Sequence, residues 1–501
     1  MLSILLLIPF LGTALLLLLP GDPPPGRMRA VAITVLSLQL LWSLRVLLAF
    51  DPGEGALQMV ESLPWVDSIG LDYRLGIDGL SMPLVLVNAA LTLVSAVCTR
   101  DISQRPRIYF AMLVLISGAV NGAFLAENLL LFFLFYELEL IPLWLLIAVW
   151  GGAGRAVAAT KFLIFTAVSG FLILGSFLGL AFTTGSVDFS ISPLLAGSLP
   201  LASQLTLLLP LLIGFGIKIP LVPFHTWLPD AHTQASTPVS VLLAGVLLKL
   251  GTYGMLRFGL QLFPEAWALL SPGLAIWAAI SVLYGSLAAI AQTDMKRMVA
   301  YSSVGHMGYV LLAAAAHTPV SLLGAVFQMV SHGLISALLF LLVGIVYRKT
   351  GTRDLEVLRG LLNPEKGLPL TGSLMTMAVM ASAGLPGMAG FISEFLVFRG
   401  SISVFPLATL LSMVGSGLTA VYFLLLVNRA FFGRLAITPS SGDPAADARL
   451  DVQLAPVAPR ETIPALALAA GVVLIGLVPA CLGRLSEVAT TAMALLSPVV
   501  R

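Results

Sequence analysis

Six titratable side chains lie inside apolar stretches of the sequence, where an unpaired charge is costly. They are Glu137, Lys218, Lys249, His306, His332 and Glu394, a mixture of acids, amines and imidazoles. Ionisable groups inside membrane-crossing segments mark ion and proton pathways by default, because their burial has to be compensated. The set therefore predicts a path for protons through an apolar interior. Structural ion pairs are the alternative, and each histidine taken singly fits a packing role equally well.

One of these residues, Lys218, lies in the stretch GFGIKIPLVPFHTWLPDAH at 214–232. Pro220 and Pro223 have no N–H to donate to the preceding helical turn, so a helix is expected to break beside Lys218. A second apolar stretch is interrupted by GLPGMAG, shortly before Glu394. Helix ends and carbonyl groups freed by such breaks stabilise charge inside a membrane, so paired breaks indicate a transport site.

The stretch YELELIP contains two glutamates whose roles must differ. Glu137 and Glu139 are two positions apart, which places them about 200° apart around a helix, so they cannot share one face. We expect one to meet a lysine and the other to meet a different helix or subunit. Pro142 leaves the carbonyl oxygen of Leu138 without its helical donor, which provides an acceptor beside Glu137.

The composition indicates an integral membrane protein. Of 501 residues, 58% are hydrophobic and 10% charged, with a mean hydropathy of +1.02, and a soluble chain of this length needs far more charge. Apolar stretches of about 20 residues recur, and lipid offers their backbones no hydrogen bonds except those within a helix. We predict an all-α polytopic membrane protein, in which residues 1–20 form a helix because they lack the basic start of a signal peptide. The fourteen or so expected transmembrane helices cover 2–20, 29–50, 77–99, 108–126, 128–150, 160–183, 204–224, 237–258, 272–292, 298–316, 320–347, 370–398, 404–432 and 462–482.

The spans fall into two units of five, each with its broken helix in the fourth place. The units are spans 4–8 and spans 9–13, so helices 7 and 12 are the broken ones. Because each unit has an odd number of spans, the second must lie inverted relative to the first. The predicted divisions are 1–105 for N-terminal helices 1–3, 106–260 and 270–433 for the two five-helix repeats, and 434–501 for a cytoplasmic loop and C-terminal helix 14.

Basic residues are distributed unevenly between the loops. Loops that follow odd-numbered spans hold eighteen of the 26 lysines and arginines, whereas loops that follow even-numbered spans hold three, namely Arg74, Arg257 and Arg399. The positive-inside rule therefore places the odd loops in the cytoplasm and both termini on the opposite side. The net charge of +2 reports membrane topology and says nothing of nucleic acid.

Soluble redox chemistry has no recognisable site in this sequence. Cys98 and Cys481 are far apart and no CxxC is present, which excludes an iron–sulfur cluster held by cysteines of this chain. No GxGxxG motif or P-loop supports nucleotide binding. His225 and His232 lack the spacing of a zinc site, and we expect them at a turn or a helix end. We therefore expect no cofactor or metal in this chain, and any redox chemistry belongs to partners.

Five stretches together resemble a known family. They are FYELELIPLWLLIAVWGG, ATKFLIFTA, KIPLVPFHTWLPDAHTQASTPVSVLLAGVLLKLGTYG, DMKRMVAYSSVGHMGYV and GLPGMAGFISEF. They are similar to the antiporter-like subunits of complex I, of the NuoM/NdhD (chain 4) type, over about residues 70–432. YELELIP resembles the cyanobacterial and plastid NDH-1 form, and LTAVYFLLLVNRAFFGRL resembles its carbon dioxide-uptake variant. The NuoL/NdhF type is disfavoured, since it carries a long lateral helix and this chain is expected to end after span fourteen.

The resemblance implies roles for the residues of the first repeat. Glu137 matches the glutamate that pairs with the lysine of the broken helix, here Lys218, and Lys249 matches a central lysine. We therefore expect Glu137, rather than Glu139, to carry the family role. A lysine in an apolar interior holds its proton less tightly, and a nearby carboxylate reverses that effect. Moving the carboxylate away would therefore eject a proton, and its return would reload one.

The second repeat carries the remaining implied roles. His306 and His332 match residues of a hydrated central axis, and Glu394 matches the terminal proton exchanger. The implied function is proton translocation, driven by quinone reduction elsewhere in an NAD(P)H-dehydrogenase-like complex of a cyanobacterial thylakoid membrane. Iron–sulfur clusters and plastoquinone would belong to partner subunits, with NdhF/NuoL-type and NdhB/NuoN-type neighbours in the membrane. A multisubunit cation/proton antiporter and a non-pumping scaffold are the alternatives.

Overall fold

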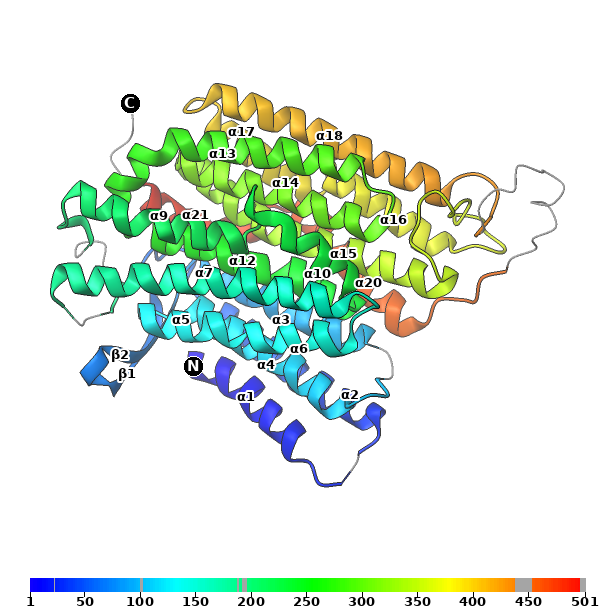
Figure 1. The fold of residues 1–501 in the computed structure, drawn as a ribbon, viewed down its shortest axis with the longest axis horizontal. Helices are drawn as coiled ribbons and strands as arrows, with labels where there is room; N and C mark the ends of the chain where they lie inside the picture. Colours follow the sequence, from blue (N-terminus) through cyan, green and yellow to red (C-terminus); the bar gives the residue numbers. More distant parts are fainter. Residues whose placement is uncertain (22, 100–101, 187–188, 192–195, 438–452, 496–501) are drawn as a thin grey trace.

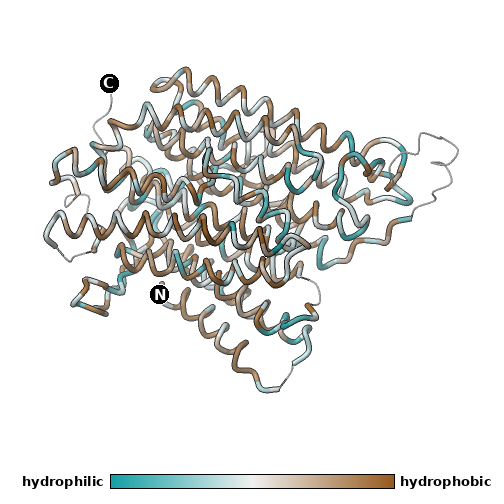
Figure 2. The backbone as a smooth tube through the Cα atoms, in the orientation of Figure 1, coloured by the Kyte–Doolittle hydropathy of each residue, from teal (hydrophilic) through white to brown (hydrophobic). Residues whose placement is uncertain are grey.

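Long helices run side by side across the molecule (Figure 1), and apolar residues predominate along their length (Figure 2). This computed structural model describes all residues except 22, 100–101, 187–188, 192–195, 438–452 and 496–501. The described part contains twelve helices long and apolar enough to cross a membrane. These helices are α2 (Pro25–Ala49), α3 (Ser81–Cys98), α4 (Pro106–Leu125), α5 and α6 (Leu129–Leu138 and Leu140–Trp150) as one span, α7 (Arg155–Thr184), α9 (Leu201–Lys218), the span Thr237–Leu260, α13 (Pro264–Ile290), α14 (Met295–Ala316), α15 (Pro319–Thr350), α18 (Pro406–Phe431) and α20 (Pro459–Leu477).

The predicted helical membrane protein is confirmed, whereas the count of fourteen spans stays a prediction. The two remaining predicted spans correspond to the shorter α1 (Leu2–Leu18) and to the pair α16 and α17 (Pro369–Ser382 and Ala389–Ser401). Peripheral helices expose large apolar side chains such as Phe171, which suits contact with lipid. By contrast, the apolar stretches of α15 and of Thr237–Leu260 are wholly buried, so these two spans form the centre of the bundle.

The two predicted helix breaks are confirmed. Helix α9 ends at Lys218, and the chain passes through the 3₁₀ turn η2 (Phe224–Thr226) into α10 (Trp227–Gln234). In the second half, residues 383–388 separate α16 from α17, and two of them, Gly384 and Gly387, have φ of +75° and +90°, a conformation that favours glycine. Each break lies in the fourth span of its predicted repeat. The division of the chain at 105, 260–270 and 433 stays a prediction.

Residues 58–77 form a short β-hairpin that the all-helical prediction did not include. Strands β1 (Gln58–Val66) and β2 (Leu71–Ile77) pair antiparallel, at one end of the bundle (Figure 1). The Glu61 carboxylate accepts hydrogen bonds from the backbone N–H groups of Leu2 (2.8 Å) and Ser3 (3.0 Å), and the Tyr73 hydroxyl donates to Ser3 Oγ (2.9 Å). The hairpin therefore caps the first turn of α1.

A further helix, α21 (Ala480–Leu495), follows α20, so the expectation that the chain ends after its last span is wrong. Its backbone packs against Gly79 near the start of α3, where an added Cβ would lie 2.3 Å from the carbonyl oxygen of Leu485. Only glycine permits this approach. The helix carries Arg484, Ser486, Glu487, Thr490 and Thr491 among its apolar residues, so the hydropathy of the sequence did not mark it as a further span.

The loops divide between two ends of the bundle. The segments 291–294 and 351–368 meet at one end, where Asp294 and Asp354 form a β-bridge, and the hairpin lies at the other (Figure 1). We call these the basic end and the hairpin end. The basic end carries Arg297 and Arg353, as the uneven distribution of basic residues predicts.

Cysteine labelling tests which end faces the cytoplasm. In a chain with both native cysteines changed to serine, Glu365→Cys at the basic end should react only from the cytoplasmic side. Ser62→Cys in the hairpin should react only from the opposite side, because basic loops are retained in the cytoplasm. The measurement is labelling by a membrane-impermeant maleimide in vesicles of known orientation. Labelling of Glu365→Cys from the outer side would overturn the assigned topology.

Candidate functional site

Lys218 forms a buried ion pair with Glu139, not with Glu137. The Lys218 ammonium donates to Glu139 Oε1, and both side chains are 0% exposed. The ammonium also lies 4.3 Å from the ring centroid of Tyr136. The pairing with Glu137 that the family resemblance implied is therefore wrong in this structure. The physical reason is local: the span is interrupted at Glu139, between α5 and α6, and this turn directs Glu139 into the bundle.

Glu137 occupies the opposite face, as expected for a residue two positions away. Its carboxylate lies against Gly170 of α7, where an added Cβ would be 2.2 Å from Oε1. Within the described residues this buried Oε1 has no hydrogen-bond partner. The charge of Lys218 still acts on both carboxylates, so the three groups form one electrostatic unit.

The central lysine, Lys249, is positioned by helical irregularities that the sequence did not reveal. Two π-helical segments, η3 (Leu243–Leu247) and η4 (Met255–Leu260), flank α12 (Leu248–Gly254), and α11 (Thr237–Leu242) begins the span. A π-helical turn shifts the helical hydrogen bonds, which makes a carbonyl available. The Lys249 ammonium donates to the carbonyl of Ala244 (2.5 Å) and lies 2.8 Å from His332 Nδ1.

The two axial histidines link Lys249 to the second broken helix. His332 Nε2 lies 3.1 Å from Ser303 Oγ, and the rings of His332 and His306 are 5.6 Å apart. His306 Nε2 lies 3.0 Å from the hydroxyl of Ser382, the last residue of α16. Both imidazoles therefore lie on one line of polar groups, which disfavours a role in packing alone.

Glu394 ends this line inside α17. Its Oε1 lies 3.8 Å from His306 Nδ1, and its Oε2 accepts a hydrogen bond from Ser416 (2.6 Å). An added Cβ at Gly384 would lie 3.0 Å from Oε2, so the break approaches the carboxylate closely. Glu394, His306 and Ser382 are among the residues that line a cavity of about 10 Å³, about the space that one water molecule needs.

The link between Lys218 and Lys249 is a packed helix contact. Lys218 lies against Gly251 on the same helix as Lys249, since an added Cβ at Gly251 would be 3.2 Å from Lys218 Cβ. The sequence placed these lysines in adjacent spans, and the structure brings their helices together. Five of the six predicted groups, all except Glu137, thus lie along the buried line, together with Glu139.

His225 and His232 lie where the sequence places them, at a turn and a helix end. His225 belongs to η2, and its ring lies 4.9 Å from that of Tyr284. His232 is in the last turn of α10, stacked 4.3 Å from Phe340. Among the described residues, no group of three or more His, Cys, Asp or Glu side chains is arranged to hold a metal ion.

A second group of buried charges, at the hairpin end, was missed by the sequence analysis. Arg257 donates to Asp78 Oδ2 (2.6 Å) and to the Tyr253 hydroxyl (3.2 Å). Burial tends to raise the pKa of Asp78, but the Arg257 charge and hydrogen bonds keep it below its ordinary value. Burial raises the pKa of neighbouring Glu127 to about 7. The sequence spacing could have indicated this group, because Tyr253 and Arg257 follow Lys249 by four and eight residues, which places the three on one helical face.

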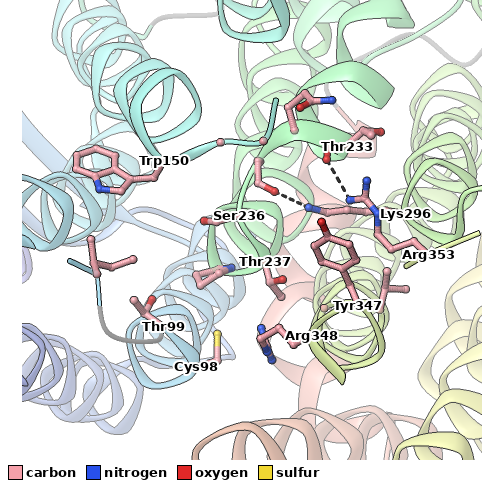
Figure 3. Close-up of a pocket in the computed structure, with 18 of the residues that line it drawn as sticks. Cys98, Thr99, Trp150, Thr233, Ser236, Thr237, Lys296, Tyr347, Arg348 and Arg353 are labelled. Carbon is pink, nitrogen blue, oxygen red and sulfur yellow. Dashed lines mark hydrogen bonds between the residues drawn. The ribbon is translucent and has the colours of Figure 1, made fainter. Parts of the chain in front are cut away.

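A larger cavity lies elsewhere, at the basic end. It has a volume of about 530 Å³, and Figure 3 shows Trp150, Lys296 and Arg353 on its wall. The Lys296 ammonium donates to the carbonyl of Ala235 (2.6 Å), and Arg353 donates to that of Thr233 (3.1 Å). None of the six predicted residues lines it. The line of buried groups is therefore separate from this cavity.

Comparisons with known proteins agree on one family. The profile described as "NADH:quinone oxidoreductase/Mrp antiporter, TM" matches residues 126–419. A protein of Thermosynechococcus vestitus named NAD(P)H-quinone oxidoreductase chain 4 2 is 40% identical, covering 98% of this chain and 91% of the relative. A chain 4 1 of a Synechococcus species is 41% identical, covering 98% and 92%.

Solved structures share the whole fold. A chain of respiratory complex I from Thermus thermophilus with bound NADH has a TM-score of 0.87 and 29% identity, covering 99% of this chain and 100% of that one. A chain of the Mrp complex from a Dietzia species has a TM-score of 0.86 and 22% identity, covering 100% and 99%. The second likeness shows the fold alone.

Proposed function

Because the chain belongs to the NADH:quinone oxidoreductase/Mrp antiporter family of membrane subunits, we propose that it translocates protons as an antiporter-like subunit of an NDH-1, complex I-type quinone oxidoreductase. The observation that carries this proposal is the line of buried proton-exchanging groups. It begins at Glu139–Lys218, continues through Lys249, His332 and His306, and ends at Glu394.

The geometry supports proton transfer in steps driven by a moving charge. The Lys218 ammonium is paired with the Glu139 carboxylate, and withdrawal of that carboxylate would leave a buried charge without its partner. The imidazole of His332, a possible proton acceptor, lies directly beside the Lys249 ammonium. From His306 a proton reaches Glu394 over 3.8 Å, beside a cavity sized for one water molecule that both side chains line. No step requires an electron carrier in this chain, so the reaction that drives the movement belongs to partner subunits.

The finer assignments rest on the named relatives. Those relatives are cyanobacterial NAD(P)H-quinone oxidoreductase subunits. We propose a thylakoid membrane as the location, with NdhF/NuoL-type and NdhB/NuoN-type subunits as membrane neighbours. Iron–sulfur clusters and plastoquinone would lie in partner subunits. The carbon dioxide-uptake form is one variant of this proposal, supported by the resemblance of the stretch around residues 418–435.

A multisubunit cation/proton antiporter is the second candidate. One observation supports it: the family profile that matches residues 126–419 describes both NADH:quinone oxidoreductase and Mrp antiporter subunits. In that case the same buried line would exchange protons against another cation, with no redox partner. The two functions therefore differ in what drives the movement and in which subunits accompany this one.

The test is to purify the chain with its native partners and to reconstitute it in vesicles. We expect mass spectrometry to find peripheral iron–sulfur subunits, and electron transfer to quinone to acidify one side of the membrane. The measurement is a pH-sensitive dye, with and without an uncoupler. If the chain instead purifies with small antiporter subunits, and a sodium gradient drives proton movement, the second candidate replaces the proposal. Quinone reduction without proton movement would favour a non-pumping scaffold role for this chain.

A further inference from the structure

We propose that the cavity of about 530 Å³ at the basic end binds the oxyanion headgroup of an anionic membrane lipid. The observation that carries this inference is a buried lysine, Lys296, which lines the cavity and has no carboxylate partner among the described residues. The inference goes beyond the proposed function, because the cavity is separate from the buried line of proton-exchanging groups.

The cavity lies where several spans begin or end. Helix α3 ends at Cys98 and α6 ends at Trp150, and both residues line the cavity. On the other side α14 begins at Met295 and α15 ends at Thr350, and residues next to these two ends complete the wall. The basic end is expected to face the cytoplasm, where basic pockets between membrane helices bind lipid headgroups. The cavity is therefore at the depth at which a headgroup would lie.

The charges around the cavity do not balance. Among its described lining residues, Lys296, Arg348 and Arg353 are basic, and none is Asp or Glu. Two carboxylates lie behind the wall: Glu461 pairs with Arg348 at 2.8 Å, and Asp294 pairs with Arg353 at 3.2 Å. Lys296 has no such partner among the described residues. The lining therefore carries an excess of positive charge, which favours an anion as the ligand.

Lys296 also keeps hydrogen-bond donors in reserve. Its side chain is 4% exposed, and its ammonium donates to the carbonyl of Ala235 (2.6 Å). An ammonium has three N–H donors, and within the described residues this is the one acceptor that it meets. The carboxylate of nearby Asp294 instead accepts from the backbone N–H of Lys296 (2.7 Å) and pairs with Arg353. An oxyanion would supply the missing acceptors and the missing charge.

The wall opposite the basic residues is largely apolar. Figure 3 shows Lys296 and Arg353 on one side of the cavity and Trp150 on the other. The ring of Trp150 packs edge to face with Tyr109, with centroids 5.2 Å apart, and Ile102 lines the cavity beside them. A cavity that is charged on one side and apolar on the other matches an amphiphile. This arrangement favours a lipid over a free inorganic anion.

The cavity is accessible from outside the bundle. Two of its lining residues, Tyr347 and Ala153, are exposed, and Tyr347 is 47% exposed. The volume lies within the range of roughly 300–1,000 Å³ that is typical of small-molecule sites. A headgroup and the first part of an acyl chain can therefore enter without separation of the helices, while the rest of the lipid stays outside.

Photo-crosslinking tests this site in the assembled complex. The complex is depleted of lipid in a neutral detergent, mixed with a phosphatidylglycerol that carries a diazirine in one acyl chain, and illuminated. We expect mass spectrometry to find crosslinks on the cavity wall, at Ile102, Trp150 or Val343. The yield there is divided by the yield at Phe171, whose ring is 74% exposed on α7 and reports non-specific contact with lipid.

Competition identifies the part of the ligand that the cavity recognises. Unlabelled phosphatidylglycerol should lower the normalised yield on the cavity wall. A neutral galactolipid with the same acyl chains should not, because it lacks the oxyanion. Inorganic phosphate at the same concentration should not compete either, because it lacks the acyl chains that contact the apolar wall.

Two variants and a matched control test the basic residues. Lys296→Met should lower the normalised yield about fivefold, the weight of one basic residue near an anionic headgroup. Arg353→Gln should lower it in the same direction and serves if Lys296→Met does not assemble. Lys349→Met removes a lysine at the same end that does not line the cavity and donates to the carbonyl of Pro456 (2.6 Å). This control should keep the wild-type yield.

Several results would overturn the inference. Absence of crosslinks on the cavity wall, or equal competition by the galactolipid, would exclude a site for an anionic headgroup. Equal competition by inorganic phosphate would assign the cavity to a free anion instead of a lipid. A wild-type yield in the assembled Lys296→Met and Arg353→Gln variants would show that these cations do not hold the headgroup. No reading uses an electron donor or a proton gradient, so failure here leaves the proposed function unaffected.

Discussion

Replacing Lys218 with methionine is expected to lower proton translocation by about tenfold or more, because each 1.4 kcal/mol added to a transfer barrier slows it about tenfold. Methionine keeps much of the length and removes the proton. It also leaves Glu139 buried without its ammonium partner, and breaking a buried ion pair from one side costs about 3–5 kcal/mol. The measurement is protons moved per quinone reduced in vesicles, with complex content determined by immunoblot.

The carboxylate variants decide which glutamate completes this pair. Glu139→Gln should impair translocation more than Glu137→Gln, because Glu139 contacts Lys218 whereas Glu137 acts on it only through space. This order is opposite to the one that the family resemblance implies. The double variant Glu139→Gln/Lys218→Met should lose little beyond the worse single variant, as coupled groups do. If all three variants assemble and translocate protons at the wild-type rate, the Glu139–Lys218 ion pair has a structural role only.

Glu394→Gln is expected to produce a loss of similar size, about tenfold, since a proton relay that lacks its last titratable group has no route at a comparable barrier. Glutamine keeps the size of the side chain and still accepts the hydrogen bond from Ser416, so assembly should survive. The same ratio of protons to quinone reports the effect. Quinone reduction in detergent, where no gradient opposes it, measures the redox partners separately.

Two further variants show whether the effect belongs to the titrating group. Glu365→Gln changes an exposed carboxylate in the loop at the basic end and should pump as the wild type does. Ser416→Ala removes the hydrogen bond but leaves the carboxylate able to titrate, so it should retain more translocation than Glu394→Gln. An unchanged proton ratio in Glu394→Gln would remove this residue from the path.

Some features of the fold follow from side-chain chemistry that acts locally. Pro220 and Pro223 cannot donate hydrogen bonds wherever they lie, so the end of α9 at Lys218 could be predicted. The same holds for the break between α16 and α17, where Gly384 and Gly387 take left-handed conformations. The hydropathy of each stretch likewise predicts a membrane helix without knowledge of its neighbours.

The partner of Lys218 could not be predicted in the same way. Glu137 and Glu139 are the same residue type two positions apart, and the family motif favoured Glu137. The choice depends on how the turn at Glu139 orients α5 relative to α6 and on the space that Gly170 leaves for the Glu137 carboxylate. Both are properties of packing between distant segments.

The sequence by itself determined that this chain is a helical membrane protein with two broken spans and titratable groups buried at mid-bundle, because these properties depend on the residue and its immediate neighbours. Only the tertiary structure decided which of those groups touch. The Arg257–Asp78 pair and the contact between Lys249 and His332 both arise where spans far apart in the chain meet. Their geometry depends on how side chains of different helices fit together, and the pattern of residues along a single helix does not contain this information.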